Sequence, residues 1–101
     1  MQVTIKGKKY ESGKILRNKY KVYTEARDRI SEKEIYDDSD LDEMVRVIVA
    51  IFDNQFTEDD VNNDMDVSDI ILNFSSMDFE IVEKVNKKAE KIQKAFMKGK
   101  K

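Results

Sequence analysis

Residues 51–60 constrain the fold of this chain most, because they join the end of one helix to the start of the next. Of the nine residues 44–52, eight are apolar, so a strongly buried element ends there. Asp53 and Asn54 favour a turn, since their short side chains bond to the local backbone. Thr57 is a good N-cap, and the three acidic residues after it suit the positive end of a helix dipole. The segment therefore predicts a helix–turn–helix.

The apolar pattern of the whole chain predicts an α+β fold that is predominantly helical, with an amino-terminal β-hairpin packed on a bundle of about four helices. Residues 3–6 alternate apolar and polar side chains, and Gly7 at the first turn position suits a type II′ turn. These features predict a hairpin at about residues 2–11. Apolar steps of three and four predict helices at about 14–30, 40–52, 58–64 and 69–97. We expect residues 1–96 to form a single domain and residues 97–101 to be a disordered tail.

Three features of these helices stay open. The β-branched run at residues 45–51 also suits a buried strand, although a cap at Ser39 or Asp40 favours a helix. Ser75 and Ser76 either kink the last helix or split it in two. The narrow, lysine-flanked apolar stripe of the last helix either packs on the domain or projects from it as an interaction helix.

The composition excludes several kinds of chemistry. The chain has no cysteine and no histidine, which excludes disulfides, thiolate zinc sites, cysteine nucleophiles and histidine acid–base catalysis. It has no Gly-rich phosphate loop and no nucleophile elbow. Asp60, Asn62 and Asp64 have the spacing of a calcium loop, but Met65 and Ile71 occupy the positions that need Gly and Glu. We therefore expect no enzyme activity, no metal and no cofactor.

Charge is divided into three blocks along the chain. Residues 1–36 carry a net charge of +5, residues 37–69 of −11 and residues 70–101 of +4. The blocks can pair within one chain, or bring copies of the chain together head to tail. Lysines interleaved with tyrosines in the first block are also typical of nucleic-acid binding, although the acidic middle and the net charge of −2 argue against it.

Seven residues of the helix–turn–helix resemble a motif of the tail assembly chaperones of long-tailed bacteriophages that infect Gram-positive bacteria. They follow a hydrophobic helix and are Phe52, Asn54, Gln55, Phe56, Thr57, Asp59 and Asp60. The similarity covers roughly residues 10–72. Capping and packing account for the motif side chains, and some of them are also candidates to face a partner.

The resemblance implies a protein that binds the tape-measure protein, keeps it soluble and assists polymerisation of the tail tube around it. Such a chaperone acts in the cytoplasm of the infected host and is absent from the mature virion. This agrees with two further expectations: without a long apolar stretch near Met1 we expect no secretion through a signal peptide, and without an apolar run of about 20 residues we expect no membrane span. Further implied partners are the tail-tube protein, other copies of the chain and a longer, frameshifted form of it.

Six apolar residues on the predicted helices are candidate partner contacts. They are Val47, Ile51, Ile81, Val85, Ile92 and Phe96. Two other functions stay open: a small phage-encoded adaptor or regulator that binds a host protein, and a weak nucleic-acid binder. Steeply salt-dependent binding to DNA or RNA would favour the latter.

Overall fold

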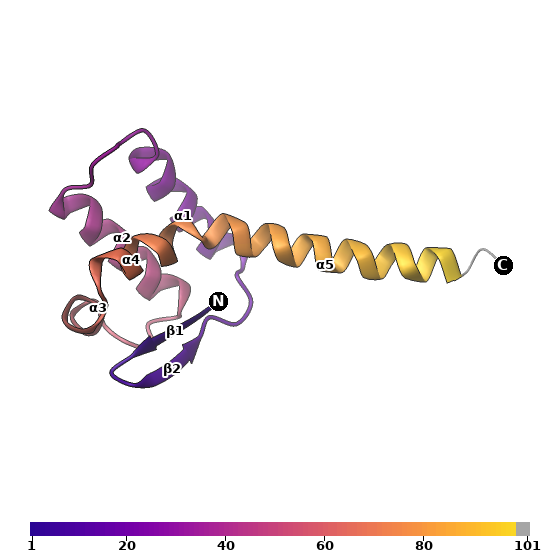
Figure 1. The fold of residues 1–101 in the computed structure, drawn as a ribbon, viewed down its shortest axis with the longest axis horizontal. Helices are drawn as coiled ribbons and strands as arrows, with labels where there is room; N and C mark the ends of the chain where they lie inside the picture. Colours follow the sequence, from indigo (N-terminus) through magenta and orange to yellow (C-terminus); the bar gives the residue numbers. More distant parts are fainter. Residues whose placement is uncertain (99–101) are drawn as a thin grey trace.

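The structure is a computed structural model that describes residues 1–98 (Figure 1). A two-stranded antiparallel hairpin precedes a set of helices, which confirms the predicted fold class. The elements, in chain order, are β1 (Gln2–Ile5), β2 (Lys8–Glu11), α1 (Arg17–Ile30), α2 (Asp38–Ile51), α3 (Glu58–Asp64), α4 (Val67–Ser75) and α5 (Met77–Lys98). Helix α5 extends through Met97 and Lys98, the first two residues of the predicted tail. Residues 99–101 of that tail lie outside the described residues.

The hairpin turns one residue earlier than its glycine suggests. Ile5 pairs with Lys8, so the two turn residues are Lys6 and Gly7. Both have positive φ, 53° and 77°, which is the geometry of a type I′ turn and not of the predicted type II′. Val3 and Ile5 point their side chains into the core, which places the hairpin against the helices.

Helix α2 lies at the centre of the core and packs against α1, α3 and α4. It is apolar on nearly all sides, and it is a helix and not the alternative strand. It starts earlier than predicted, because Asp37 and not Ser39 or Asp40 is the N-cap. The Asp37 carboxylate accepts from the Asp40 backbone N–H at 2.9 Å, and the Asp40 carboxylate accepts from the Asp37 N–H at 3.0 Å. This reciprocal pair is a capping box.

The turn between α2 and α3 is the predicted helix–turn–helix. Asp53 and Asn54 have φ values of 56° and 57°, the left-handed region that short polar side chains tolerate best after glycine. Thr57 then caps α3 in a second capping box with Asp60, through contacts of 3.1 and 3.0 Å. Local side-chain chemistry therefore fixes both the end of α2 and the start of α3.

The last predicted helix is split in two at Ser76, which settles the choice between a kink and a break. Ser76 has φ −78° and ψ −6°, and its hydroxyl donates to the Asn73 carbonyl at 3.1 Å. Beyond the break, α5 leaves the other elements and projects as a single long helix (Figure 1). The Cα radius of gyration is 16.4 Å, against about 13 Å for a compact chain of 100 residues. We call residues 1–76 the body.

Candidate partner-binding surface

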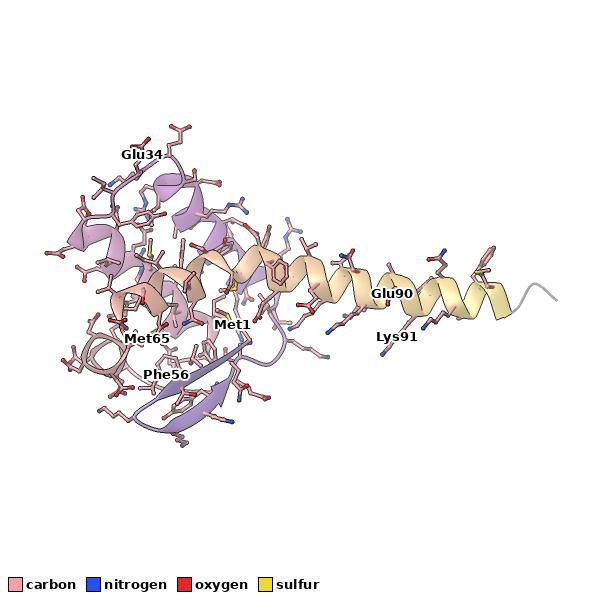
Figure 2. All side chains as sticks on the ribbon, viewed as in Figure 1. Met1, Glu34, Phe56, Met65, Glu90 and Lys91 are labelled. Atoms are coloured by element: carbon pink, nitrogen blue, oxygen red, sulfur yellow. The ribbon has the colours of Figure 1, made fainter. Side chains whose placement is uncertain are left out.

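The family-motif residues hold the helix–turn–helix against the hairpin. Phe52 and Phe56 are buried, and the Phe56 ring contacts those of Phe52 and Tyr10 at centroid distances of 5.4 and 5.1 Å. The Gln55 side-chain amide donates to the backbone carbonyl of Glu11 at 2.8 Å. Figure 2 shows Phe56 between the hairpin and the helices. Three of the motif side chains, Phe52, Gln55 and Phe56, are therefore used in packing the body or in binding the end of β2.

The polar members of the motif also connect to the hairpin turn. The Lys6 ammonium donates to the Asp60 carboxylate at 3.0 Å, and the Lys6 backbone N–H donates to Asp64 at 2.7 Å. The hydrogen bond with the Thr57 backbone N–H, followed by that with Lys6, lowers the pKa of Asp60 to about 2. Asp59 is exposed and takes no part in this capping box. Asn54, Phe56 and Thr57 meet at the rim of one shallow hollow beside the turn.

Two of the predicted partner contacts lie in the core. Val47 and Ile51 have exposed fractions of 0%, in a helix that packs against α1, α3 and α4. An all-round apolar helix indicates either a central position or a covered surface, and here the chain itself covers it. Neither side chain is available to a partner of the folded chain.

The other predicted contacts lie on α5, at increasing distance from the body. Ile81 is half-buried and packs against the core. Val85, Ile92 and Phe96 are exposed by 58%, 71% and 61%. Val82, which the list of predicted contacts omits although it continues the same spacing, is exposed by 55%. These four exposed residues and the exposed Ala89 form one row along α5. We call this row the α5 stripe: Val82, Val85, Ala89, Ile92 and Phe96.

The base of α5 is fixed to the body by its first turn. Met77 is fully buried, and the Asp78 carboxylate accepts two hydrogen bonds from Arg27 at 3.1 and 2.9 Å. The Tyr23 hydroxyl donates to the same carboxylate at 3.0 Å. Burial, followed by this hydrogen bond, raises the pKa of Tyr23 above its ordinary value. The direction in which α5 leaves the body is therefore set by packing and charge on α1.

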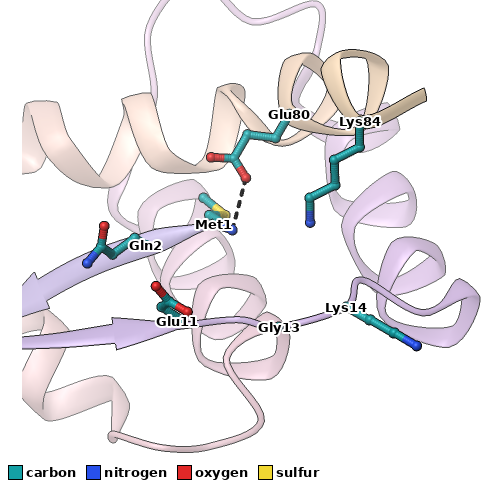
Figure 3. A pocket seen from close by; sticks show the side chains of 7 residues that line it. All are labelled: Met1, Gln2, Glu11, Gly13, Lys14, Glu80 and Lys84. Carbon is teal, nitrogen blue, oxygen red and sulfur yellow. Dashed lines mark ion pairs between the residues drawn. The ribbon is translucent and has the colours of Figure 1, made fainter. Parts of the chain in front are cut away.

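A second contact lies on another side of the same helix. The Glu80 carboxylate pairs with the amino group of Met1 at 3.3 Å, beside a hollow whose rim also carries Lys84 (Figure 3). This hollow is lined by charged and polar groups and by no apolar cluster. Figure 2 shows that Glu90 and Lys91, farther along α5, lie well away from every other element.

The first two charge blocks partly neutralise each other inside the body. Five ion pairs join the basic amino-terminal block to the acidic middle: Lys6–Asp60, Lys19–Asp53, Arg29–Glu43, Lys33–Asp37 and Lys33–Asp40. The basic carboxy-terminal block behaves differently. Among the described residues beyond Glu80, the one ion pair is Lys87–Glu83 at 3.5 Å, within α5 itself. The first two blocks thus fold back on each other, as one of the two alternatives predicts, whereas the described lysines of α5 make no ion pair with the body.

Neither a metal-binding group nor a membrane-spanning helix is found within residues 1–98. Among the described residues, no group of three or more Asp and Glu side chains is placed to hold a metal ion. Within the same part of the chain, no helix is both long enough and apolar enough to cross a membrane. What the fold does present is a capped helical body that carries a projecting amphipathic helix.

These features define a small helical protein-binding module. The chain belongs to the phage tail chaperone protein family, which it matches over residues 1–98. The match therefore includes α5, which the sequence motif alone does not reach. Proteins of this family are non-catalytic chaperones. Comparisons with curated proteins and with solved structures returned no match.

Proposed function

We propose that this tail chaperone, from a phage of a Gram-positive host, binds the tape-measure protein and keeps it soluble while tail-tube subunits polymerise around it. It acts in the cytoplasm of the infected cell and is absent from the mature virion. The α5 stripe makes the contact with the client. Other copies of the chain, the tail-tube protein and a longer frameshifted form are its further partners.

The observation that carries this proposal is the α5 stripe on a helix that leaves the body. Four large apolar side chains of the stripe are each more than half exposed in one row. Monomeric proteins rarely expose a contiguous row of large apolar side chains, and such a row is typical of a surface that another chain covers. Burying what is still exposed of each side chain contributes about 1 kcal/mol. One stripe alone therefore binds weakly.

Weak individual contacts suit a chaperone of a long helical client. Several copies on one client act at high effective concentration, so the array holds tightly although each copy exchanges. The same weakness lets tube subunits displace the copies one by one, without an energy source. The body contributes rigidity, since its motif residues are used in capping and packing.

The test is co-expression of the chain with the tape-measure protein of its phage, followed by size-exclusion chromatography with light scattering. We expect the client to be soluble and to co-elute with several copies of the chain. The proposal fails if the client stays insoluble with this chain and with its frameshifted form.

A matched pair of variants locates the contact. Ile92→Ser removes the centre of the outer stripe, while Ile35→Ser makes the same change at a residue of the α1–α2 loop that is 86% exposed. We expect Ile92→Ser to lower the yield of soluble client and Ile35→Ser to leave it unchanged. Equal yields for the two variants would place the contact elsewhere on the chain.

A further inference from the structure

The spacing of the α5 stripe is that of a coiled-coil seam. Its members follow each other at intervals of three, four, three and four residues, from Val82 to Phe96. A helix that packs on a broad apolar surface needs a wider face, whereas this repeat faces one partner helix along its length. The row covers about two heptads, or about 21 Å at 1.5 Å per residue.

The two flanks of the stripe differ in charge. At about 100° per residue, Lys84, Lys88 and Lys91 lie along one flank, while Asn86, Glu90 and Gln93 lie along the other. None of these three lysines makes an ion pair within the described residues. The positive charge on this flank is therefore available to a partner, unlike the charge of the amino-terminal block.

From these two features we infer that the stripe pairs with a client helix that has a matching three–four apolar repeat and carries Asp or Glu along one flank. The inference rests on the proposed function and specifies which segment of the tape-measure protein is bound. The acidic flank lies against Lys84, Lys88 and Lys91. The other flank of the client helix lies against Asn86, Glu90 and Gln93 and carries polar residues that are not acidic.

A second copy of the chain is a poorer occupant. Another α5 brings the same excess of lysine over glutamate, six against two in residues 82–98, so two such helices repel each other. The acidic middle block of another body is already partly neutralised by its own amino-terminal block. An acidic client helix meets neither obstacle.

The experiment uses overlapping peptides, each about four heptads long, that together cover the tape-measure protein. Their binding to the full chain is measured by fluorescence anisotropy at low and at high salt. We expect the bound peptides to be those with a three–four apolar repeat and a net negative charge, and their affinity to fall with salt. Binding restricted to peptides of net positive charge, or to none, overturns the inference.

Charge reversal on α5 supplies the matched control. Lys88→Glu with Lys91→Glu reverses two flank charges, and Lys9→Glu with Lys21→Glu makes the same change in net charge at exposed positions on the body. We expect the α5 double variant to bind the acidic peptides about tenfold more weakly and the body variant to bind them as the unaltered chain does. Equal losses for the two variants overturn the inference.

Two outcomes separate this inference from the proposed function. If the α5 double variant still solubilises the client on co-expression and peptide binding ignores charge, the chaperone function stands and the acidic-flank inference fails. If the chain without peptide forms a concentration-dependent dimer that Ile92→Ser abolishes, the stripe belongs to a second copy and the inference is overturned. A client that no form of the chain solubilises refutes the proposed function itself.

Discussion

The hydroxyl of Tyr23, in the middle of α1, donates a hydrogen bond at 3.0 Å to the carboxylate of Asp78, in the first turn of α5. The two residues are 55 positions apart in the sequence, and their contact decides how α5 leaves the body. Asp78 also suits the first turn of α5 because its negative charge meets the positive end of the helix dipole. The Asp78 carboxylate therefore interacts with the dipole of α5, with the Tyr23 hydroxyl and with the Arg27 guanidinium.

Removing this hydrogen bond should weaken the junction without leaving a cavity. Tyr23→Phe deletes one hydroxyl from a buried ring, and we expect the free energy of unfolding to fall by about 1 kcal/mol. Denaturant unfolding measures the change. Tyr36→Phe is the control, at a half-buried ring that lines the same hollow as Tyr23 and whose hydroxyl makes no hydrogen bond within the described residues. A similar loss in both variants would mean that the bond to Asp78 contributes nothing specific.

The capping boxes of α2 and α3 predict a loss of stability in acid. Hydrogen bonds with Ser39 and the Asp40 backbone lower the pKa of Asp37 to about 2, and the bonds described above do the same for Asp60. Because the folded pKa is lower than that of the unfolded chain, near 3.8, the unfolded state takes up protons first as the pH falls. The stabilisation is complete above about pH 5 and is lost as the pH falls to about 2.

The measurement is the free energy of unfolding between pH 7 and pH 2, for the unaltered chain and for Asp60→Asn. We expect the difference between the two to be largest at pH 7 and to shrink as the pH falls through this window. Asp59→Asn, in the same helical turn but outside the capping box, controls for the charge. A difference for Asp60→Asn that does not change with pH would contradict the prediction.

A buried and an exposed isoleucine distinguish residues that stabilise the fold from residues that are available to a partner. Ile51 lies at 0% exposure in the core and Ile92 is largely exposed on α5. Ile51→Ala should lower the free energy of unfolding by about 2–5 kcal/mol, through lost apolar burial and a cavity. Ile92→Ala should change it by less than about 0.5 kcal/mol. A loss of several kcal/mol for Ile92→Ala would show that α5 packs on the body in solution.

The hairpin turn requires glycine at position 7 because of the backbone conformation there, and not because a side chain would clash. Gly7 has φ +77°, and a Cβ at this position meets no heavy atom within 4 Å. Gly7→Ala should therefore cost about 1–2 kcal/mol of folding free energy through backbone strain alone. Thermal unfolding by circular dichroism measures it. An unchanged melting temperature would mean that the turn adjusts without strain.

Local signals account for most of what the sequence predicts correctly. Alternation and a glycine predict the hairpin, and Thr57 with Asp60 predicts the start of α3, because capping depends on residues that are neighbours in the chain. The start of α2 is misplaced because three acidic residues and a serine compete for one cap position in residues 37–40. The predicted turn type is wrong because the strand register, and not the glycine alone, determines which two residues form the turn.

The candidate site shows where local signals end. An apolar pattern says that Val47 and Val85 will be covered, but not whether the same chain or another one covers them. That depends on which elements pack against α2 and on the direction in which α5 projects from the body, and both follow from the tertiary arrangement. Likewise, the charge blocks are visible in the sequence, but which of them pair is visible only in the fold.

The break at Ser76 and the projection of α5 have a consequence for how such a chain can diverge. The outer turns of α5 share no core with the body, so a substitution there changes what is recognised without changing whether the body folds. The binding specificity of α5 can therefore change one residue at a time, as the sequence of the client changes, without a loss of folding stability. In the body, by contrast, a substitution in the two capping boxes or at the buried phenylalanines of the motif lowers the stability of the fold itself.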